Sequence, residues 1–227
     1  LDPRLDAART LLAAGKAEAG RTEDSIAALR AVSPESPYFT TARIEMMWAL
    51  ARLEHNAEAV SAAEETALLA PSQQTRLALA DLHRSLEHWA EAEKIYDAEI
   101  NSNPPKDDPE TARIYFSRGA VRERLNRWPE AEADLLKALE MAPNDADVLN
   151  YLGYSWVDRG ENIEKAMGLI ERAVALQPES GFIVDSLGWA QYKLGRYDEA
   201  TATLENAVEL APGEATINDH LGDAYWQ

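Results

Sequence analysis

The chain has 227 residues, and its formal net charge at pH 7 is −18. A nucleic-acid-binding protein needs a basic footprint on its surface, and this acidic balance excludes that class. The same charge disfavours binding to anionic membrane surfaces. No apolar run approaches the roughly 18 residues of a transmembrane helix, so no direct membrane insertion is expected. Because cysteine is absent, the chain has no disulfide, no thiolate metal site and no catalytic thiol.

Six of the 11 prolines recur with one phase along the chain. Their separations are 34, 33, 39, 35 and 34 residues, and they are Pro37, Pro71, Pro104, Pro143, Pro178 and Pro212. Because proline cannot continue a helix and moves the preceding residue out of the α region, each one marks a helix end. Self-similarity with a period near 34 residues indicates a helical array. The prediction is an all-α helical-repeat solenoid of antiparallel helix pairs, with at least 12 helices.

The proline phase divides the chain, taken as a single array over residues 1–227, into six repeats and a lone final helix. The predicted repeats are residues 6–39, 40–72, 73–111, 112–145, 146–180 and 181–214, and a single first helix follows at 215–227. The stretch Asn103–Pro109 lengthens the third repeat and predicts a surface loop, with a seam between sub-arrays at 103–111 as the alternative. The chain begins without methionine and stops inside a repeat, so we expect an excised fragment.

Small residues recur where the first helix of each pair is expected to cross the second. In the first helices they are Ala13, Ala80, Gly119, Gly153, Gly188 and Gly222, with Met47 as the exception; in the second helices they are Ser25, Ala59, Ala92, Ala131, Ala166 and Ala200. A glycine inside a helix is about 1 kcal/mol less favourable than alanine, so it predicts a compensating close approach of two backbones. Turns between paired helices are predicted at Gly20, Asn126, Gly160 and Gly195.

No residue pattern indicates catalysis or a cofactor. The four histidines, His55, His83, His88 and His220, are scattered along the chain. His83 and His88 are five residues apart, whereas side chains on one helix face are three or four apart, so no metal site is predicted. No Gly-rich loop follows a strand, and solvated helix faces explain the abundant carboxylates. We therefore expect a protein that is not an enzyme and that has no cofactor.

The pairs Leu152-Gly153 and Leu187-Gly188 lie 35 residues apart, and each is followed by a turn, an apolar helix and a proline. This pattern resembles the tetratricopeptide repeat, a helix–turn–helix unit. The resemblance implies a right-handed superhelix with a concave groove lined by the first helices. It also marks Glu99 as a departure, because the family usually has alanine at that place, and this predicts looser packing in the third repeat.

In that family, the side chains at positions 2, 5, 9, 12 and 13 of each repeat lie on its first helix and line the groove. We call these positions the groove stripe. In the last two repeats and the final helix the stripe is rich in aromatic residues, which implies a groove for a protein or peptide partner. The predicted binding residues are Asn150, Tyr154, Phe182, Asp185, Trp189, Tyr192, Asp219, Asp223 and Trp226. The alternative is that these rings pack between adjacent first helices. Exposure is favoured for Tyr154 and Trp189, and the alternative stays open for Trp226.

Residues 112–227 carry a narrower resemblance, through the segments 149–156, 184–197 and 219–223. These segments are similar to large tetratricopeptide proteins of Gram-negative envelopes, some of which are lipoprotein adaptors of a periplasmic carboxyl-terminal processing protease. The resemblance implies a scaffold that binds a protein partner, such as a protease or its substrate. It favours a location in the periplasm or at the outer membrane, with the cytoplasm as the alternative. A self-associating structural protein with an unused groove is the second hypothesis.

Overall fold

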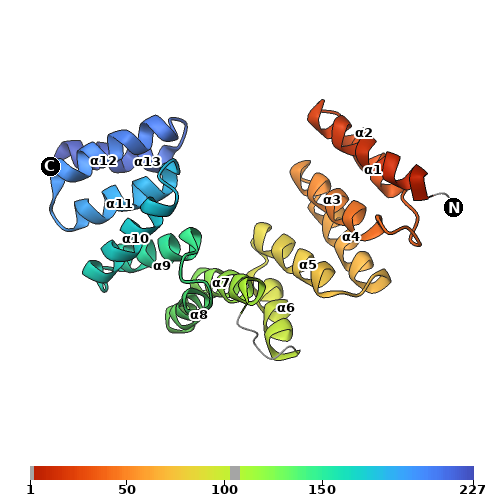
Figure 1. Ribbon diagram of the computed structural model, residues 1–227, viewed down its shortest axis with the longest axis horizontal. Coiled ribbons are helices and arrows are strands. Elements are labelled where there is room, and N and C mark those ends of the chain that lie inside the picture. The colour runs from red at the N-terminus through yellow and green to blue at the C-terminus, as the bar shows by residue number, and fades with distance from the viewer. Residues whose placement is uncertain (1–2, 103–107) are drawn as a thin grey trace. The chain divides into compact units, whose positions relative to one another are not determined.

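The computed structural model describes residues 3–102 and 108–227, and every regular element in these ranges is an α-helix. These residues form thirteen helices, which Figure 1 labels in chain order. Within the same ranges, no helix combines the length and the apolar character that crossing a membrane requires. The predicted all-α fold is confirmed.

The chain divides into two compact units, residues 1–104 with 121–127 and residues 105–120 with 128–227. The first unit contains α1 (Pro3–Glu18), α2 (Thr22–Arg30), α3 (Phe39–Arg52), α4 (Asn56–Leu69), α5 (Gln73–Ser85) and α6 (Trp89–Ser102). α7 (Pro109–Arg124) contributes residues to both units. The second unit contains α8 (Trp128–Met141), α9 (Ala146–Arg159), α10 (Ile163–Leu176), α11 (Gly181–Lys193), α12 (Tyr197–Leu210) and α13 (Ala215–Trp226).

Within each unit the helices pack in pairs. In the first unit α1 packs on α2, α3 on α4 and α5 on α6; in the second unit α9 packs on α10 and α11 on α12. First helices of neighbouring pairs also touch, as α3 does with α5, α9 with α11 and α11 with α13. The predicted pairing of helices is therefore confirmed for these five pairs. The right-handed superhelix over the whole chain stays a prediction.

α7 begins at Pro109, three residues before the predicted start of the fourth repeat. Proline suits the first position of a helix because its missing N–H has no intrahelical partner there. The Oδ1 atom of Asp108 accepts a hydrogen bond from the N–H of Thr111 at 2.8 Å and caps the helix end. The predicted seam at 103–111 stays a prediction, and residues 103–107 of it lie outside the described residues.

The turn between the two helices of a pair enters the left-handed region of backbone space. The φ angles there are 73° at Gly20, 60° at Glu54, 60° at Glu87, 58° at Asn126, 69° at Gly160 and 74° at Gly195. The four turns predicted from glycine and asparagine are confirmed. The turns at Glu54 and Glu87 were not predicted, because glutamate carries no signal for a conformation that costs an ordinary L residue about 1–2 kcal/mol.

Glycine allows the first and second helices of a pair to approach closely in the second unit. A Cβ atom at Gly153 would lie 2.7 Å from Cγ1 of Ile170 and 3.1 Å from the carbonyl oxygen of Ala166. A Cβ atom at Gly188 would lie 2.6 Å from Cγ of Leu204, and one at Gly119 would lie 3.1 Å from Cγ of Leu135. The predicted close approach is confirmed at these three glycines.

We expect Gly153→Ala to lower the free energy of unfolding by about 1–2 kcal/mol, because the overpacking against α10 exceeds the gain in helix propensity. The control is Gly168→Ala in α10, where a Cβ atom would meet nothing within 4 Å. That variant should raise the free energy of unfolding by up to about 1 kcal/mol. Urea denaturation followed by circular dichroism measures both. A stabilising effect of Gly153→Ala would contradict the close approach.

Glu99 of α6 is buried and paired. Its side chain is 2% exposed and accepts hydrogen bonds from Nε and Nη2 of Arg76 in α5. The hydrogen bond to Glu99 raises the pKa of the Arg76 guanidinium. Glu99 therefore stands where the family usually has alanine, and its ion pair with Arg76 joins α5 and α6. Looser packing of the third repeat stays a prediction.

Candidate functional site

Trp189 of α11 is buried, with 9% of its surface exposed. Its ring stacks on Tyr192, with centroids 4.9 Å apart and planes 7° apart, and on His220 of α13, at 4.1 Å and 12°. The Nζ atom of Lys193 lies 4.7 Å from the ring centroid. The expected exposure of Trp189 in a groove is therefore wrong. The reason is that the ring of His220, on the first helix of the following repeat (α13), covers the indole. This is the alternative in which the aromatic rings pack between adjacent first helices.

Asp185 of α11, predicted to be a polar clamp for a partner, is instead bonded within the fold. Its side chain is 8% exposed, and its two carboxylate oxygens lie 2.9 and 3.1 Å from Nδ1 of His220. Because an ionised carboxylate only accepts hydrogen bonds, Nδ1 is the proton-bearing nitrogen of His220 in this contact. Asp185 therefore links α11 to α13, and its role in binding a partner stays a prediction.

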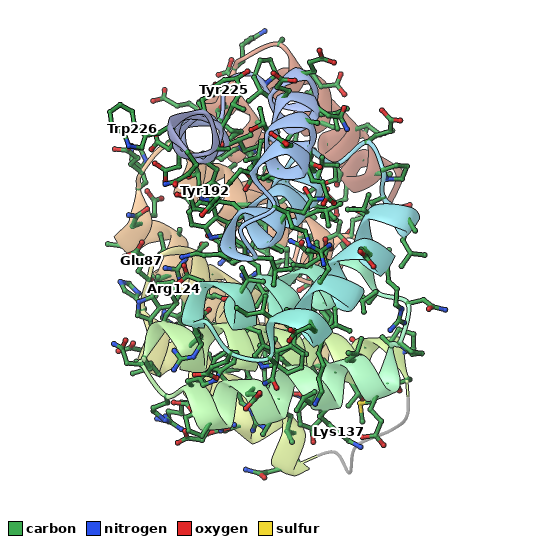
Figure 2. All side chains as sticks on the ribbon, turned by 90° about the vertical axis from the view of Figure 1, so that its left-hand side faces the viewer. Glu87, Arg124, Lys137, Tyr192, Tyr225 and Trp226 are labelled. Carbon is green, nitrogen blue, oxygen red and sulfur yellow. The ribbon has the colours of Figure 1, made fainter. Side chains whose placement is uncertain are left out.

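The other predicted binding residues fall into two groups. Asn150, Tyr154 and Tyr192 are half-buried, and the hydroxyl of Tyr192 accepts a hydrogen bond from Nε2 of Gln227 at 3.3 Å. The exposed group is Phe182, Asp219, Asp223 and Trp226. Phe182 is 58% and Trp226 88% exposed. In Figure 2 Trp226 projects outward at the end of α13, whereas Tyr192 lies closer to the helices. In the second unit, the structure thus leaves only part of the predicted stripe open to a partner.

The first unit contains a recess that the predicted binding residues do not include. It lies between α1, α2 and α3, and its volume is about 310 Å³. Its lining consists of Ala14, Ala17, Ser25, Leu29, Glu45, Trp48, Ala49 and Arg52. Pockets that hold small ligands begin at about 300 Å³, so the space suits one large side chain of a bound segment.

The lining of this recess is apolar at its centre and charged at its rim. Trp48 is half-buried, and Leu29 and Ala49 are buried beside it. Glu45 and Arg52 are exposed, and neither has an ion-pair partner among the residues that the structure describes. They stand seven residues apart on α3, which is two helical turns, so both lie on one side of the helix.

Four lining residues belong to the groove stripe. Ala14 and Ala17 take positions 9 and 12 of the first repeat, and Trp48 and Arg52 take positions 9 and 13 of the second. The missed signal was Trp48, which has the same position in its repeat as Tyr154 and Trp189. The aromatic richness of the second half of the chain directed the prediction away from it.

The structure brings together two histidines that do not share a helix face. The Nδ1 atoms of His83 and His88 lie 3.3 Å apart, although the residues are five apart in sequence. The helix-face rule does not apply to them, because α5 ends at Ser85 and the left-handed turn at Glu87 brings the chain back.

Comparison with known proteins adds a family model described as tetratricopeptide repeat, which matches residues 77–146, 121–181 and 186–227, more than half of the chain. The chain is 32% identical over 118 residues to the TPR repeat-containing protein PA4667 of Pseudomonas aeruginosa, a match covering 52% of this chain and 20% of that protein. It is 29% identical over 157 residues to the protein O-mannosyl-transferase TMTC1 of Mus musculus, covering 67% of this chain and 16% of that protein. The chain thus spans a fifth or less of the length of these two relatives.

A solved structure with the same fold is that of YrrB, described as a TPR protein with an unusual peptide-binding site. The TM-score is 0.57 and the sequence identity 15%, and the likeness covers 80% of this chain and 91% of YrrB. At this identity the likeness concerns the fold.

Proposed function

The chain belongs to the tetratricopeptide-repeat family, and we propose that it is a non-enzymatic scaffold that binds a segment of a partner protein in the recess between α1, α2 and α3. Proteins of this family generally mediate protein–protein interactions. The observation that carries the proposal is the coincidence of the recess with the groove stripe, at Trp48 and Arg52. Tryptophan and arginine are enriched among the residues that dominate binding energy.

The chemistry of the recess defines the segment it would accept. An apolar side chain of the partner would enter against Trp48 and Leu29, because burial of apolar surface provides the main driving force. Arg52 would contact an acidic residue of the segment, and Glu45 a basic one, on either side of the inserted side chain. The partner class is therefore a peptide segment with an apolar residue flanked by charges of both signs.

Selection of binding peptides from a displayed random library tests this function. Two variants alter the recess and are expected to weaken the selected peptides at least about tenfold, or 1.4 kcal/mol. Ala17→Leu fills the space, and Arg52→Glu reverses the rim charge. The matched controls are Ala202→Leu and Arg196→Glu, which change exposed residues of the second unit and should leave binding intact. Peptides that bind all four variants equally would show that the recess is not the binding site.

A finer proposal is that the partner is an envelope protease or its substrate and that the protein acts in the periplasm or at the outer membrane. It is supported by the resemblance of residues 112–227 to envelope adaptors. Capture from fractionated cells with the parent chain and with Arg52→Glu tests it. An envelope protease or hydrolase captured by the parent chain and lost with the variant is the expected result, and capture of cytoplasmic proteins alone contradicts it.

Self-association is the second candidate function, because Phe182, Tyr225 and Trp226 expose large apolar surfaces in the second unit. Exposed aromatic surface of this kind favours contact between proteins. Light scattering over a range of concentrations distinguishes the two candidates. A mass that rises with concentration and falls with Trp226→Ser favours self-association, whereas a constant monomer mass favours the recess.

A further inference from the structure

We propose that His83 and His88 form a two-imidazole clip that binds a divalent transition-metal cation such as Zn²⁺ at the turn between α5 and α6. His83 lies in the last turn of α5, and His88 directly precedes α6. The site is independent of the recess between α1, α2 and α3, so it stands or falls separately from the proposed partner binding.

The backbone brings the two histidines close together. Glu87, at φ 60°, turns the chain, and the N–H of His88 donates a hydrogen bond to the carbonyl oxygen of His83 at 2.9 Å. The two rings are tilted by 47°, with their centroids 5.5 Å apart. This short closed turn places both residues on one local frame, so the clip does not depend on the placement of distant parts of the chain.

The distance between the ring nitrogens matches metal coordination. Zinc binds histidine nitrogen at about 2.0–2.1 Å with tetrahedral geometry, which puts two nitrogens on the same ion about 3.3–3.4 Å apart. The Nδ1 atoms of His83 and His88 are 3.3 Å apart. Without metal, the same two nitrogens form a hydrogen bond between the rings, and Zn²⁺ would replace the proton that they share. Water would supply the remaining ligands.

The electrostatic surroundings suit a cation. Glu64 of α4 and Glu91 of α6 line the same cavity as His83 and supply negative charge there. These carboxylates and His83 line a cavity of about 390 Å³.

The same cavity has other charged groups, and they do not cancel this effect. Arg76 and Glu99 line it but pair with each other, and Lys94 of α6 is the remaining cation. Among the residues that the structure describes, no group of three or more His, Asp or Glu side chains could hold a metal. The clip is therefore a site with two protein ligands, and imidazole favours zinc, copper and nickel over magnesium or calcium.

The chain contains a natural control for this site. His55 precedes α4 as His88 precedes α6, and its N–H donates to the carbonyl oxygen of Leu50 at 3.0 Å, after a left-handed Glu54. In the turn between α3 and α4, Leu50 has the position that His83 has in the turn between α5 and α6. The hairpin between α3 and α4 thus presents one imidazole on an equivalent turn, without the second.

Titration of the full chain with ZnCl₂ at pH 7.5, followed by calorimetry, tests the clip. We expect one Zn²⁺ per chain in the parent protein, about tenfold or greater weakening with His88→Ala, and no change with His55→Ala. His88 is exposed, so its replacement leaves the fold intact, whereas His83→Gln serves as a second variant at the buried ligand. Nitrogen chemical shifts of the histidines should move at Nδ1 of both His83 and His88.

Two results would overturn the proposal. Zn²⁺ bound equally well by His88→Ala would assign the ion to surface carboxylates. Equal losses with His88→Ala and His55→Ala would show that single exposed imidazoles bind the metal without a clip.

Discussion

Replacing Trp189 with alanine is expected to lower the free energy of unfolding by about 3–5 kcal/mol. The indole is 9% exposed and stacks on Tyr192 of its own helix and on His220 of α13. Its removal leaves a cavity and breaks the contact between α11 and α13. Chemical denaturation followed by circular dichroism measures the change, with the transition of the second unit as the readout.

The matched control is Trp226→Ala, which removes the same side chain from a position that is 88% exposed. A surface substitution of this kind should change the free energy of unfolding by no more than about 0.5 kcal/mol. Similarly small effects of both variants would show that the ring of Trp189 does not contribute to the packing of α11 against α13. The predicted exposure of this ring to a partner would then hold.

Replacing Arg118 with methionine should lower the free energy of unfolding by about 3–5 kcal/mol, because it leaves a buried carboxylate without its cation. Arg118 of α7 donates to Asp134 of α8 through two hydrogen bonds, Nε to Oδ2 at 2.8 Å and Nη2 to Oδ1 at 2.6 Å. The two side chains are 10% and 5% exposed. Thermal and urea unfolding of the purified variant measure the loss.

Two further variants identify the cause of that loss. The double variant Arg118→Met with Asp134→Leu removes both charges and should recover most of the stability, because an apolar pair can replace a buried ion pair. Arg21→Met breaks the exposed pair with Asp24, whose side chains are 63% and 49% exposed, and should change stability by less than about 1 kcal/mol. A double variant as unstable as the single one would show that lost packing, not the unpaired charge, is responsible.

The sequence was sufficient to predict the helix pairs, because their signals are local. The phase of the prolines marks where second helices end, and at the helix crossings Gly153 stands opposite Ala166 and Gly188 opposite Leu204. Each of these signals lies within one repeat, so a period of about 34 residues is enough to read it.

The candidate site was harder to predict, because its features depend on residues that are far apart or on unusual turns. Trp189 is covered by His220, which lies 31 residues later, in α13. The position of Trp189 within its own repeat does not indicate this contact. The contact of His83 with His88 requires a left-handed glutamate, which no turn rule predicts. The recess at Trp48 depends on the space left among α1, α2 and α3, and position in the repeat alone does not give that space.

The contact of Asp185 and Trp189 with His220 joins two first helices without passing through α12. In a linear array, coupling between neighbouring units decides whether the units melt one after another or together. A direct bridge between α11 and α13 adds to the coupling that α12 already provides. We therefore expect these three helices to unfold together, so that a change which releases one of them lowers the stability of all three.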